Sequence, residues 1–323
     1  MTSRYSTDRN SPFFSVIIPT YNRRQFLCDA IDSVLEQTFV DFELIVADDG
    51  STDGTYEMIC SSYDDPRLRI LRLQNSGASA ARNAAMQESC GRWLAFLDSD
   101  DTWLPQKLQH AAEFIADDRG DFLYTGVAPS TDSAQQDYSQ NEITARSAKE
   151  YLFSGFAIKT STVVVRRDSI ANPAAEFGVQ KTCGDYVFFW KALCLCERVA
   201  FMPYRDTVIR VSGDNLTLSH NPSAMLADEL KAIDAVSAWF VEHALCTGYR
   251  LKLADLRYWQ VRSLLAACLL FGQFGSFVRH TGAALRCYGL GKGCGLVARA
   301  VYLTFFAGQR RWLKGYGRRQ YGS

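Results

Sequence analysis

Short apolar runs rich in β-branched residues alternate with amphipathic stretches along the first hundred residues. Residues 14–18 form such a run, which ends at Pro19, and residues 23–37 then repeat apolar side chains at helical spacing. The pattern recurs, so we predict strands at residues 14–18, 43–47, 68–71 and 93–97 and helices at residues 23–37, 53–62 and 79–88. Strands that alternate with helices indicate a mostly parallel sheet with helices on both faces. Ligands bind such sheets beyond the carboxyl ends of the strands.

The second half of the chain has a less regular pattern. We predict helices at residues 105–116, 186–196 and 223–245 and strands at residues 122–125, 162–166 and 198–204. Residues 129–141 are rich in Ser, Asp and Gln, which predicts an exposed loop or lid. We therefore expect an α/β domain over residues 13–220, preceded by a disordered tail (residues 1–12) and followed by a helical basic extension (residues 221–323).

Composition narrows the class of protein. With 323 residues, 47% of them hydrophobic, the chain can bury a sizeable core, which excludes a disordered or collagen-like protein. The ten cysteines are scattered without a Cys-x-x-Cys pair, so we expect neither a zinc site nor a disulfide framework. Residues 1–11 lack the apolar stretch of a secretory signal, and no run reaches the roughly eighteen apolar residues of a clear membrane span. These features predict a cytoplasmic location.

Four segments lie at or just past the ends of predicted strands. They are residues 16–22 (VIIPTYN), 48–53 (DDGSTD), 75–83 (NSGASAARN) and 96–101 (FLDSDD). In order and spacing they resemble the family-2 glycosyltransferases of GT-A fold, inverting enzymes of the bacterial envelope and exopolysaccharide type. The resemblance covers roughly residues 14–215 and is dense up to Asp101. It implies that residues 13–220 form a GT-A-like (Rossmann-like) catalytic domain, which transfers a sugar from a nucleotide-sugar donor to an acceptor hydroxyl.

Three carboxylates stand within residues 98–101, directly after the strand predicted at residues 93–97. They repel one another unless a cation lies among them, and a nucleoside diphosphate that leaves needs its negative charge neutralised. A hard divalent cation held by carboxylates meets both needs. The resemblance implies that Asp100 binds Mg²⁺ or Mn²⁺ directly and that Asp98 shares the metal site and lies nearer the ribose. The alternative is an acidic turn in which Asp101 caps the next helix.

Further side chains at the strand ends are candidates for binding the donor. A carboxylate can accept the N3 proton of uracil or thymine, and by resemblance Asp48 is our choice for contacting the base. A plain turn at residues 48–51 and a surface ion pair for Arg82 are the structural alternatives. Residues 210–217 resemble a loop that closes over the diphosphate, although Ser212 stands where the family has His. The full set of predicted nucleotide contacts is Pro19, Thr20, Tyr21, Asp48, Arg82, Asp98 and Arg210.

The base that activates the acceptor is expected in the less similar second half. Family members usually open a helix with a Glu-Asp pair, and Gly184-Asp185 stands at the matching position. A hydroxyl is a poor nucleophile, so a carboxylate that removes its proton during attack assists the reaction. Direct displacement then inverts the anomeric carbon. By resemblance Asp185 is the catalytic base, and the alternative is a residue that only caps the helix.

The C-terminal stretch differs in charge from the rest of the chain. The last acidic residue is Asp255, and residues 257–319 contribute eleven Lys and Arg to a chain whose formal net charge is zero. Apolar patches at residues 263–278 and 297–306 accompany these cations, a composition typical of interfacial helices on anionic membranes. A tail for nucleic acid would need far less Leu and Phe. Helices packed on the catalytic domain or on another subunit are the alternative.

Taken together, these features predict a metal-dependent glycosyltransferase of the hexosyltransferase type. We expect its donor to be a UDP- or dTDP-sugar. Its expected acceptor is a lipid-linked or envelope glycan, reached at the inner face of the cell membrane through peripheral contact by the tail. One alternative is a nucleotidyltransferase that makes a nucleotide-sugar, but the first strand lacks the Gly-rich basic loop that a triphosphate would need. Another is a catalytically inactive nucleotide-sugar-binding scaffold at the membrane.

Overall fold

The computed structural model describes residues 11–128, 158–172, 174–180, 183–210 and 222–243, with a few single positions between 261 and 297. The chain divides into two compact units, one of residues 1–179 and 188–211 and the other of residues 180–187 and 212–323. The loop predicted at residues 129–141, the segment 211–217 and most of the basic tail lie outside the described residues.

The first unit contains an eight-stranded sheet in the order β3-β2-β1-β4-β7-β6-β8-β5. Strands β1 to β4 are mutually parallel, β6 and β8 are also parallel, and β7 runs antiparallel to both of its neighbours. The strands are β1 (Phe14–Thr20), β2 (Phe42–Asp48), β3 (Leu68–Arg72), β4 (Trp93–Phe96), β5 (Thr102–Trp103), β6 (Phe122–Val127), β7 (Val163–Arg166) and β8 (Val199–Val208).

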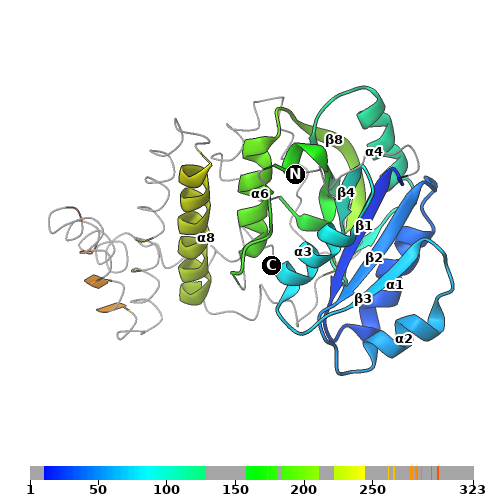
Figure 1. The fold of residues 1–323 in the computed structure, drawn as a ribbon, viewed down its shortest axis with the longest axis horizontal. Helices are drawn as coiled ribbons and strands as arrows, with labels where there is room; N and C mark the ends of the chain where they lie inside the picture. Colours follow the sequence, from blue (N-terminus) through cyan, green and yellow to red (C-terminus); the bar gives the residue numbers. More distant parts are fainter. Residues whose placement is uncertain are drawn as a thin grey trace, which may run out of the picture. The chain divides into compact units, whose positions relative to one another are not determined.

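Helices cover both faces of this sheet (Figure 1). On one face Val16 and Ile18 join a core with Leu27 and Ile31 of α1. That core also takes in side chains of α2 and α4. On the other face α3 contacts β1 and β2, and α6 places two phenylalanines against β4 and β6. The helices of this unit are α1 (Arg24–Leu35), α2 (Thr55–Ser62), α3 (Ala78–Glu88), α4 (Lys107–Ala116) and α6 (Gly184–Leu195), whose first turn belongs to the other unit.

The central strands are apolar at nearly every position because both of their faces are covered. All seven residues of β1 and all seven of β2 are buried, whereas the edge strand β3 is only partly buried. This burial explains why the sequence shows continuous apolar runs at residues 14–18 and 43–47 in place of strict alternation. The arrangement puts the carboxyl ends of β1, β2 and β4 at one edge of the sheet.

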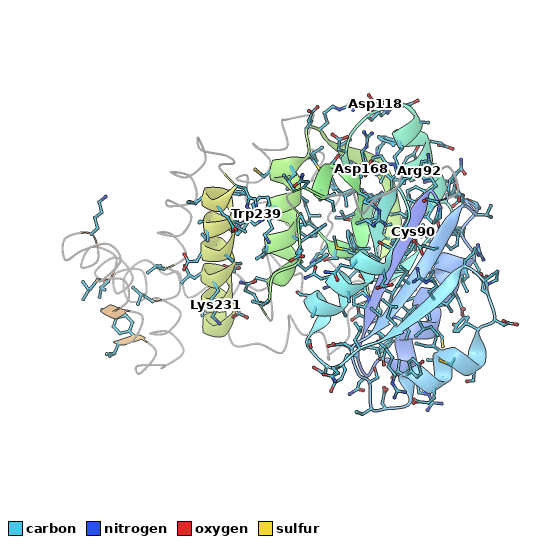
Figure 2. All side chains as sticks on the ribbon, viewed as in Figure 1. Cys90, Arg92, Asp118, Asp168, Lys231 and Trp239 are labelled. Atoms are coloured by element: carbon cyan, nitrogen blue, oxygen red, sulfur yellow. The ribbon has the colours of Figure 1, made fainter. Side chains whose placement is uncertain are left out.

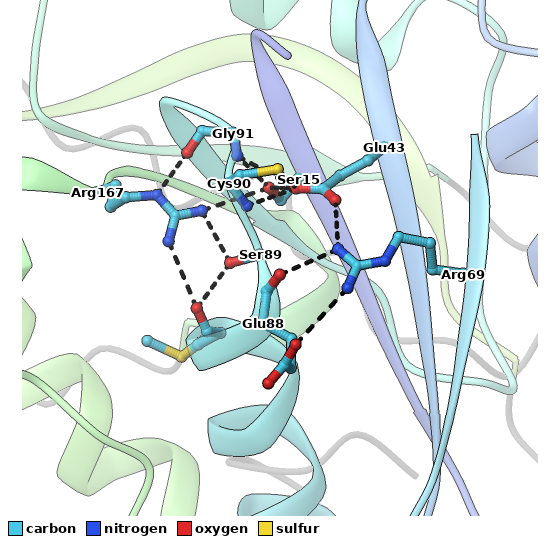
Figure 3. Close-up of polar contacts among 9 residues, drawn as sticks. Ser15, Glu43, Arg69, Glu88, Ser89, Cys90, Gly91 and Arg167 are labelled. Atoms are coloured by element: carbon cyan, nitrogen blue, oxygen red, sulfur yellow. Dashed lines mark hydrogen bonds and ion pairs between the residues drawn. The ribbon is translucent and has the colours of Figure 1, made fainter. Parts of the chain in front are cut away.

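A buried polar cluster joins the opposite ends of these strands (Figure 3). Glu43 accepts hydrogen bonds from Ser15 Oγ at 2.7 Å and from the backbone N–H of Cys90 at 2.6 Å. Burial alone would raise the pKa of Glu43, but these hydrogen bonds lower it overall. Arg167 donates to the carbonyl of Gly91 at 2.5 Å and to Ser15 Oγ at 3.4 Å. The cluster therefore anchors the turn before β4 to β1 and β2.

The second unit contributes one long described helix, α8 (Pro222–Glu242). Ile233, Val236 and Phe240 are buried along one side of it, while Lys231 is exposed (Figure 2). Trp239 is buried too, with its ring 5.7 Å from that of Phe240. None of the helices in the described ranges is both long enough and apolar enough to cross a membrane.

The predicted α/β class, a mostly parallel sheet with helices on both faces, is confirmed. Each predicted strand and helix outside the masked ranges is present, with ends that differ by a few residues. The sheet is mixed, since β7 is antiparallel, and β5 was not predicted because two residues are too short for a periodic signal. Two short 3₁₀ turns, η2 (Thr160–Thr162) and η3 (Asp168–Ile170), flank β7 and were also missed.

Candidate active site

The carboxyl edge of the sheet brings the predicted segments together. Thr20 and Asp48 are register partners at the ends of β1 and β2, and Ile17 of β1 is the register partner of Phe96, the last residue of β4. Asp98 therefore lies two residues beyond the end of β4, a strand that is hydrogen-bonded to β1. Segments separated by up to eighty residues in sequence meet here because parallel strands end at a common edge.

The acidic pair after β2 is built into the loops at this edge. Asp48 is fully buried, and the backbone N–H of Ser51 lies 3.3 Å from its carboxylate while Ser51 Oγ also donates to it. Asp49 accepts hydrogen bonds from the N–H groups of Ser76 at 2.8 Å and Gly77 at 2.7 Å. Both carboxylates thus stabilise turns, which agrees with the alternative that this segment is a structural turn. The contact of Asp48 with a base stays a prediction.

The end of β1 offers an exposed ring and a buried hydroxyl. Tyr21 is 45% exposed, whereas Thr20 is only 3% exposed. The Oγ1 atom of Thr20 is buried and has no hydrogen-bond partner among the described residues. Asn22 adopts φ of 51° and fastens this loop to the next one, because its side-chain oxygen accepts the N–H of Thr52 at 2.8 Å. Pro19, the residue before Thr20 in β1, is buried as well.

Arg82 of α3 reaches the turn that follows β4. Its Nη2 lies 2.5 Å from Asp98 Oδ1, and its guanidinium carbon lies 5.2 Å from the ring centre of Phe177. Asn83 holds that ring in place, since it accepts the N–H of Phe177 at 2.8 Å and donates to its carbonyl at 3.0 Å. The Nε of Arg82 is buried without a partner among the described residues. The side chain of Arg82 in this ion pair is 11% exposed. The pair therefore differs from the surface ion pair that was the alternative for Arg82.

The carboxylates of the acidic turn at residues 98–101 differ in their hydrogen-bond partners. Asp101 is 5% exposed, and its two oxygens accept hydrogen bonds from Ser161 Oγ at 2.5 Å and from the N–H of Arg210 at 3.1 Å. It precedes β5 and α4 begins only at Lys107, so the idea that Asp101 caps the next helix is wrong. Among the described residues, no side chain forms a hydrogen bond with the carboxylate of Asp100.

Burial and, after it, neighbouring negative charge raise the pKa values of two of these carboxyl groups. Burial and the nearby charge of Asp98 raise the pKa of Asp100, although Arg23 and Arg210 oppose the shift. Burial and the charges of Asp98 and Asp100 raise the pKa of Asp101 well above its usual range. A divalent cation beside the turn would relieve this repulsion.

The side chains that could hold a cation suit a site completed by ligand phosphates and water better than one built from protein ligands alone. Within the described residues no group of three or more His, Cys, Asp or Glu is placed to hold a metal ion. Mg²⁺ is commonly held by one or two carboxylates together with substrate phosphates and water. Asp100, with Asp98 beside it, matches that donor set. Metal binding by both residues stays a prediction.

Arg210 follows β8 and lies near this turn, but its side chain has other partners. Its Nη2 is 2.7 Å from Asp29 Oδ2, and its guanidinium carbon lies 5.0 Å from the ring centre of Phe26 on α1. Its charge only opposes the rise in the pKa of Asp100 that burial and Asp98 cause. In this conformation Arg210 bridges β8 to α1, and contact with a phosphate would require it to leave Asp29. That contact stays a prediction.

Asp185 belongs to the second compact unit, where it lies in the first turn of α6. The helix begins at Gly184, so Asp185 follows the cap position. Its Oδ1 accepts the N–H of Tyr186 at 2.9 Å. A carboxylate in the first turn is stabilised by the helix dipole. The proton-accepting role of Asp185 stays a prediction.

Two contributors to this site were not predicted. Ser161 in η2 and Asn83 in α3 touch the acidic turn or the ring beside Arg82, yet both are ordinary polar residues in sequence. Asn83 at least follows Arg82 within one of the four segments, so its position carried a signal. Ser161 lies in a Thr-Ser-Thr run that gave none.

Several known proteins are similar in sequence to about a third of this chain. A putative teichuronic acid biosynthesis glycosyltransferase, TuaG of Bacillus subtilis, is 43% identical over 120 residues, which cover 36% of this chain and 47% of TuaG. A UDP-Glc:α-D-GlcNAc-diphosphoundecaprenol β-1,3-glucosyltransferase, WfgD of Escherichia coli, is 38% identical over 111 residues, 34% of this chain and 44% of WfgD. The chain thus spans less than half the length of these relatives.

Solved structures extend the similarity of fold over most of the chain. S. aureus TarS 1-349 in complex with UDP-GlcNAc has a TM-score of 0.62 at 19% identity and covers 96% of this chain and 93% of its own. The mannosyltransferase PcManGT from Pyrobaculum calidifontis, in complex with GDP-Man and Mn²⁺, has a TM-score of 0.58 at 16% identity, with 97% and 87% covered. The predicted GT-A-like fold is therefore confirmed. The model of glycosyl transferase family 2 matches residues 15–172, and this segment is accordingly a glycosyl transferase family 2 domain.

Proposed function

We propose that the protein is a glycosyltransferase that moves a sugar from a UDP- or dTDP-sugar to an acceptor hydroxyl, with Mg²⁺ or Mn²⁺ bound beside the donor diphosphate. One observation carries the proposal. At the carboxyl edge of a family 2 domain, the Arg82–Asp98 pair stands next to Asp100, a half-buried carboxylate with no side-chain partner among the residues described.

Buried polar atoms at this edge support binding of a polar ligand. Thr20 Oγ1 and Arg82 Nε are both buried without partners in the described part of the chain. Buried donors and acceptors are nearly always satisfied, so such atoms in a site point to a bound group. The exposed ring of Tyr21 beside Thr20 offers a surface on which a base could pack. A nucleotide would meet all three features.

When bound, the cation neutralises charge that develops on the departing diphosphate. Asp100 and Asp98 are the residues proposed to hold it, and PcManGT, a solved structure of similar fold, contains Mn²⁺ with its GDP-Man. Arg82 would orient the donor while it fixes Asp98. The proposed role of Asp185 is to accept the proton of the acceptor hydroxyl, so that a single displacement inverts the anomeric centre.

The proposed acceptor is a lipid-linked or envelope glycan. WfgD acts, by its name, on a diphosphoundecaprenol-linked GlcNAc, and TuaG is named for teichuronic acid biosynthesis. A basic tail in contact with anionic lipid at the inner face of the membrane would place the protein beside such acceptors. Of the alternatives, the inactive scaffold shares every donor-site feature and differs only in turnover.

A panel of nucleotide-sugars separates these possibilities. Melting temperature is measured with each compound in Mn²⁺ and in EDTA, because a bound donor raises it by mass action. We expect UDP- or dTDP-sugars to stabilise the wild type in Mn²⁺ and to be turned over with a suitable acceptor. Asp100→Asn should lose both effects while Ser99→Ala, a control in the same turn, keeps them. A panel without any stabilising compound, or full activity of Asp100→Asn in EDTA, would refute the proposal.

A further inference from the structure

The acidic turn at residues 98–101 does not hold its own shape. A single backbone hydrogen bond closes it, from the N–H of Asp101 to the carbonyl of Asp98 at 3.0 Å. Three carboxylates lie close together within it and repel one another when they are ionised. Groups outside the turn must therefore hold it in place.

The hydroxyl of Ser161 bridges the two ends of this turn. It accepts the backbone N–H of Asp98 at 3.1 Å and donates to Asp101 Oδ2 at 2.5 Å. Ser161 is 1% exposed, so water does not substitute for these bonds. One buried oxygen thus fixes both the first and the last residue of the turn.

Ser161 is itself fixed by three other elements. Its carbonyl accepts hydrogen bonds from Trp103 Nε1 of β5 at 2.8 Å and from Thr207 Oγ1 of β8 at 3.2 Å. The Nζ of Lys107 of α4 donates to the next carbonyl, that of Thr162, at 3.0 Å. The 3₁₀ turn η2 is therefore a rigid support that transmits the positions of β5, β8 and α4 to the acidic turn.

The support also reaches Arg210, two residues after the end of β8. The second oxygen of Asp101 accepts the N–H of Arg210 at 3.1 Å. Because Ser161 orients the carboxylate of Asp101, it also positions the backbone N–H of Arg210. The acidic turn and the backbone of Arg210 are thus held together through one hydroxyl.

We infer that Ser161 is a positioning residue that holds the acidic turn in the geometry required for cation-dependent binding of the donor. The inference rests on the proposed function and adds a residue that lies sixty positions away from the turn it controls. Ser161 touches neither donor nor cation in this proposal. Its effect passes through Asp98 and Asp101.

Ser161→Ala removes only the bridging oxygen, so the bonds to the carbonyl of residue 161 can persist. The matched control is Thr162→Val, which removes a buried hydroxyl from the same 3₁₀ turn, one that bonds only the carbonyl of Lys159 at 2.7 Å. Should Ser161→Ala fail to fold, Ser161→Thr and Ser161→Val provide the same comparison, because their side chains are nearly equal in shape and differ in the hydroxyl.

The test is calorimetric titration of full-length protein with UDP and with dTDP, in Mn²⁺ and in EDTA. We expect Ser161→Ala to weaken binding in Mn²⁺ about tenfold, the effect of losing a hydrogen bond to a charged group, and to change binding in EDTA less than about twofold. Thr162→Val should match the wild type in both.

Equal losses in Mn²⁺ and EDTA would show a general structural role and overturn the inference, as would wild-type binding by Ser161→Ala. These outcomes leave the proposed function intact. A wild type that binds neither UDP nor dTDP under either condition would overturn the proposed function and the inference with it.

Discussion

Replacing Lys107 by methionine should remove a pH dependence from the stability of the protein. Lys107 is fully buried on α4, and its Nζ donates to Thr125 Oγ1 at 2.6 Å and to the carbonyl of Thr162 at 3.0 Å. Burial lowers its pKa from 10.5 to about 7, while the charge of Asp206 opposes the shift. The Trp103 ring centre lies 5.8 Å from the amine. The charged state of Lys107 is costly because burial removes water from the ammonium, and this cost exceeds what Asp206 restores.

The magnitude follows from linkage. Between pH 7 and 10.5 the unfolded chain keeps a proton on this amine that the folded chain has lost, so the free energy of unfolding rises with pH. Each pH unit contributes up to about 1.4 kcal/mol, and the rise from pH 7 to 9 is roughly 2 to 2.5 kcal/mol because the group is half protonated at its pKa. Below pH 7 both states hold the proton and the contribution no longer changes.

Urea unfolding at pH 7, 8 and 9 measures this slope in the wild type and in Lys107→Met. The buried thiol of Cys196, whose pKa burial raises, acts in the opposite direction at alkaline pH, but it is present in both proteins and cancels in the difference. Methionine leaves Thr125 and the Thr162 carbonyl without this donor, so its overall stability also falls, and only the difference in slope is diagnostic. Parallel pH profiles for the two proteins would show that Lys107 stays charged, and would refute the reasoning.

Three further predictions concern the base, the fold and the tail. Asp185→Asn should keep donor binding but lose transfer about a hundredfold; near-normal turnover would assign the base elsewhere. Gly91→Ala should destabilise the fold by roughly 2 to 4 kcal/mol in urea unfolding, because an added Cβ would lie 2.5 Å from the backbone nitrogen of Ser15; a change below about 0.5 kcal/mol would contradict that clash. Deleting residues 272–323 should release the protein from anionic vesicles in co-sedimentation, since each cation contributes about 1 kcal/mol near the surface; a full-length protein that stays in the supernatant at low salt would exclude the membrane contact.

The fold was largely predictable because its central strands carry a strong local signal. The runs at residues 14–18 and 43–47 are apolar at almost every position, and the helices between them show clear periodicity, so β1 to β4 and α1 to α3 were all anticipated. The reversed direction of β7 was not, because an antiparallel strand buried on both faces has the same composition as a parallel one. Its direction is set by pairing with β4 and β6, which are remote in sequence.

The segments that form the candidate site could be predicted from the sequence. The separate roles of the residues within each segment could not. Residues 98–101 present three carboxylates that sequence alone cannot rank, whereas the structure separates them by their partners. Asp101 has both oxygens engaged by Ser161 and the backbone of Arg210, and Asp98 is paired with Arg82. Those partners lie at least sixteen positions away, so no local pattern reveals them. Among the described residues, Asp100 is the carboxylate of this turn that has no side-chain partner. The proposed metal binding therefore depends on Asp100 more than on the other two.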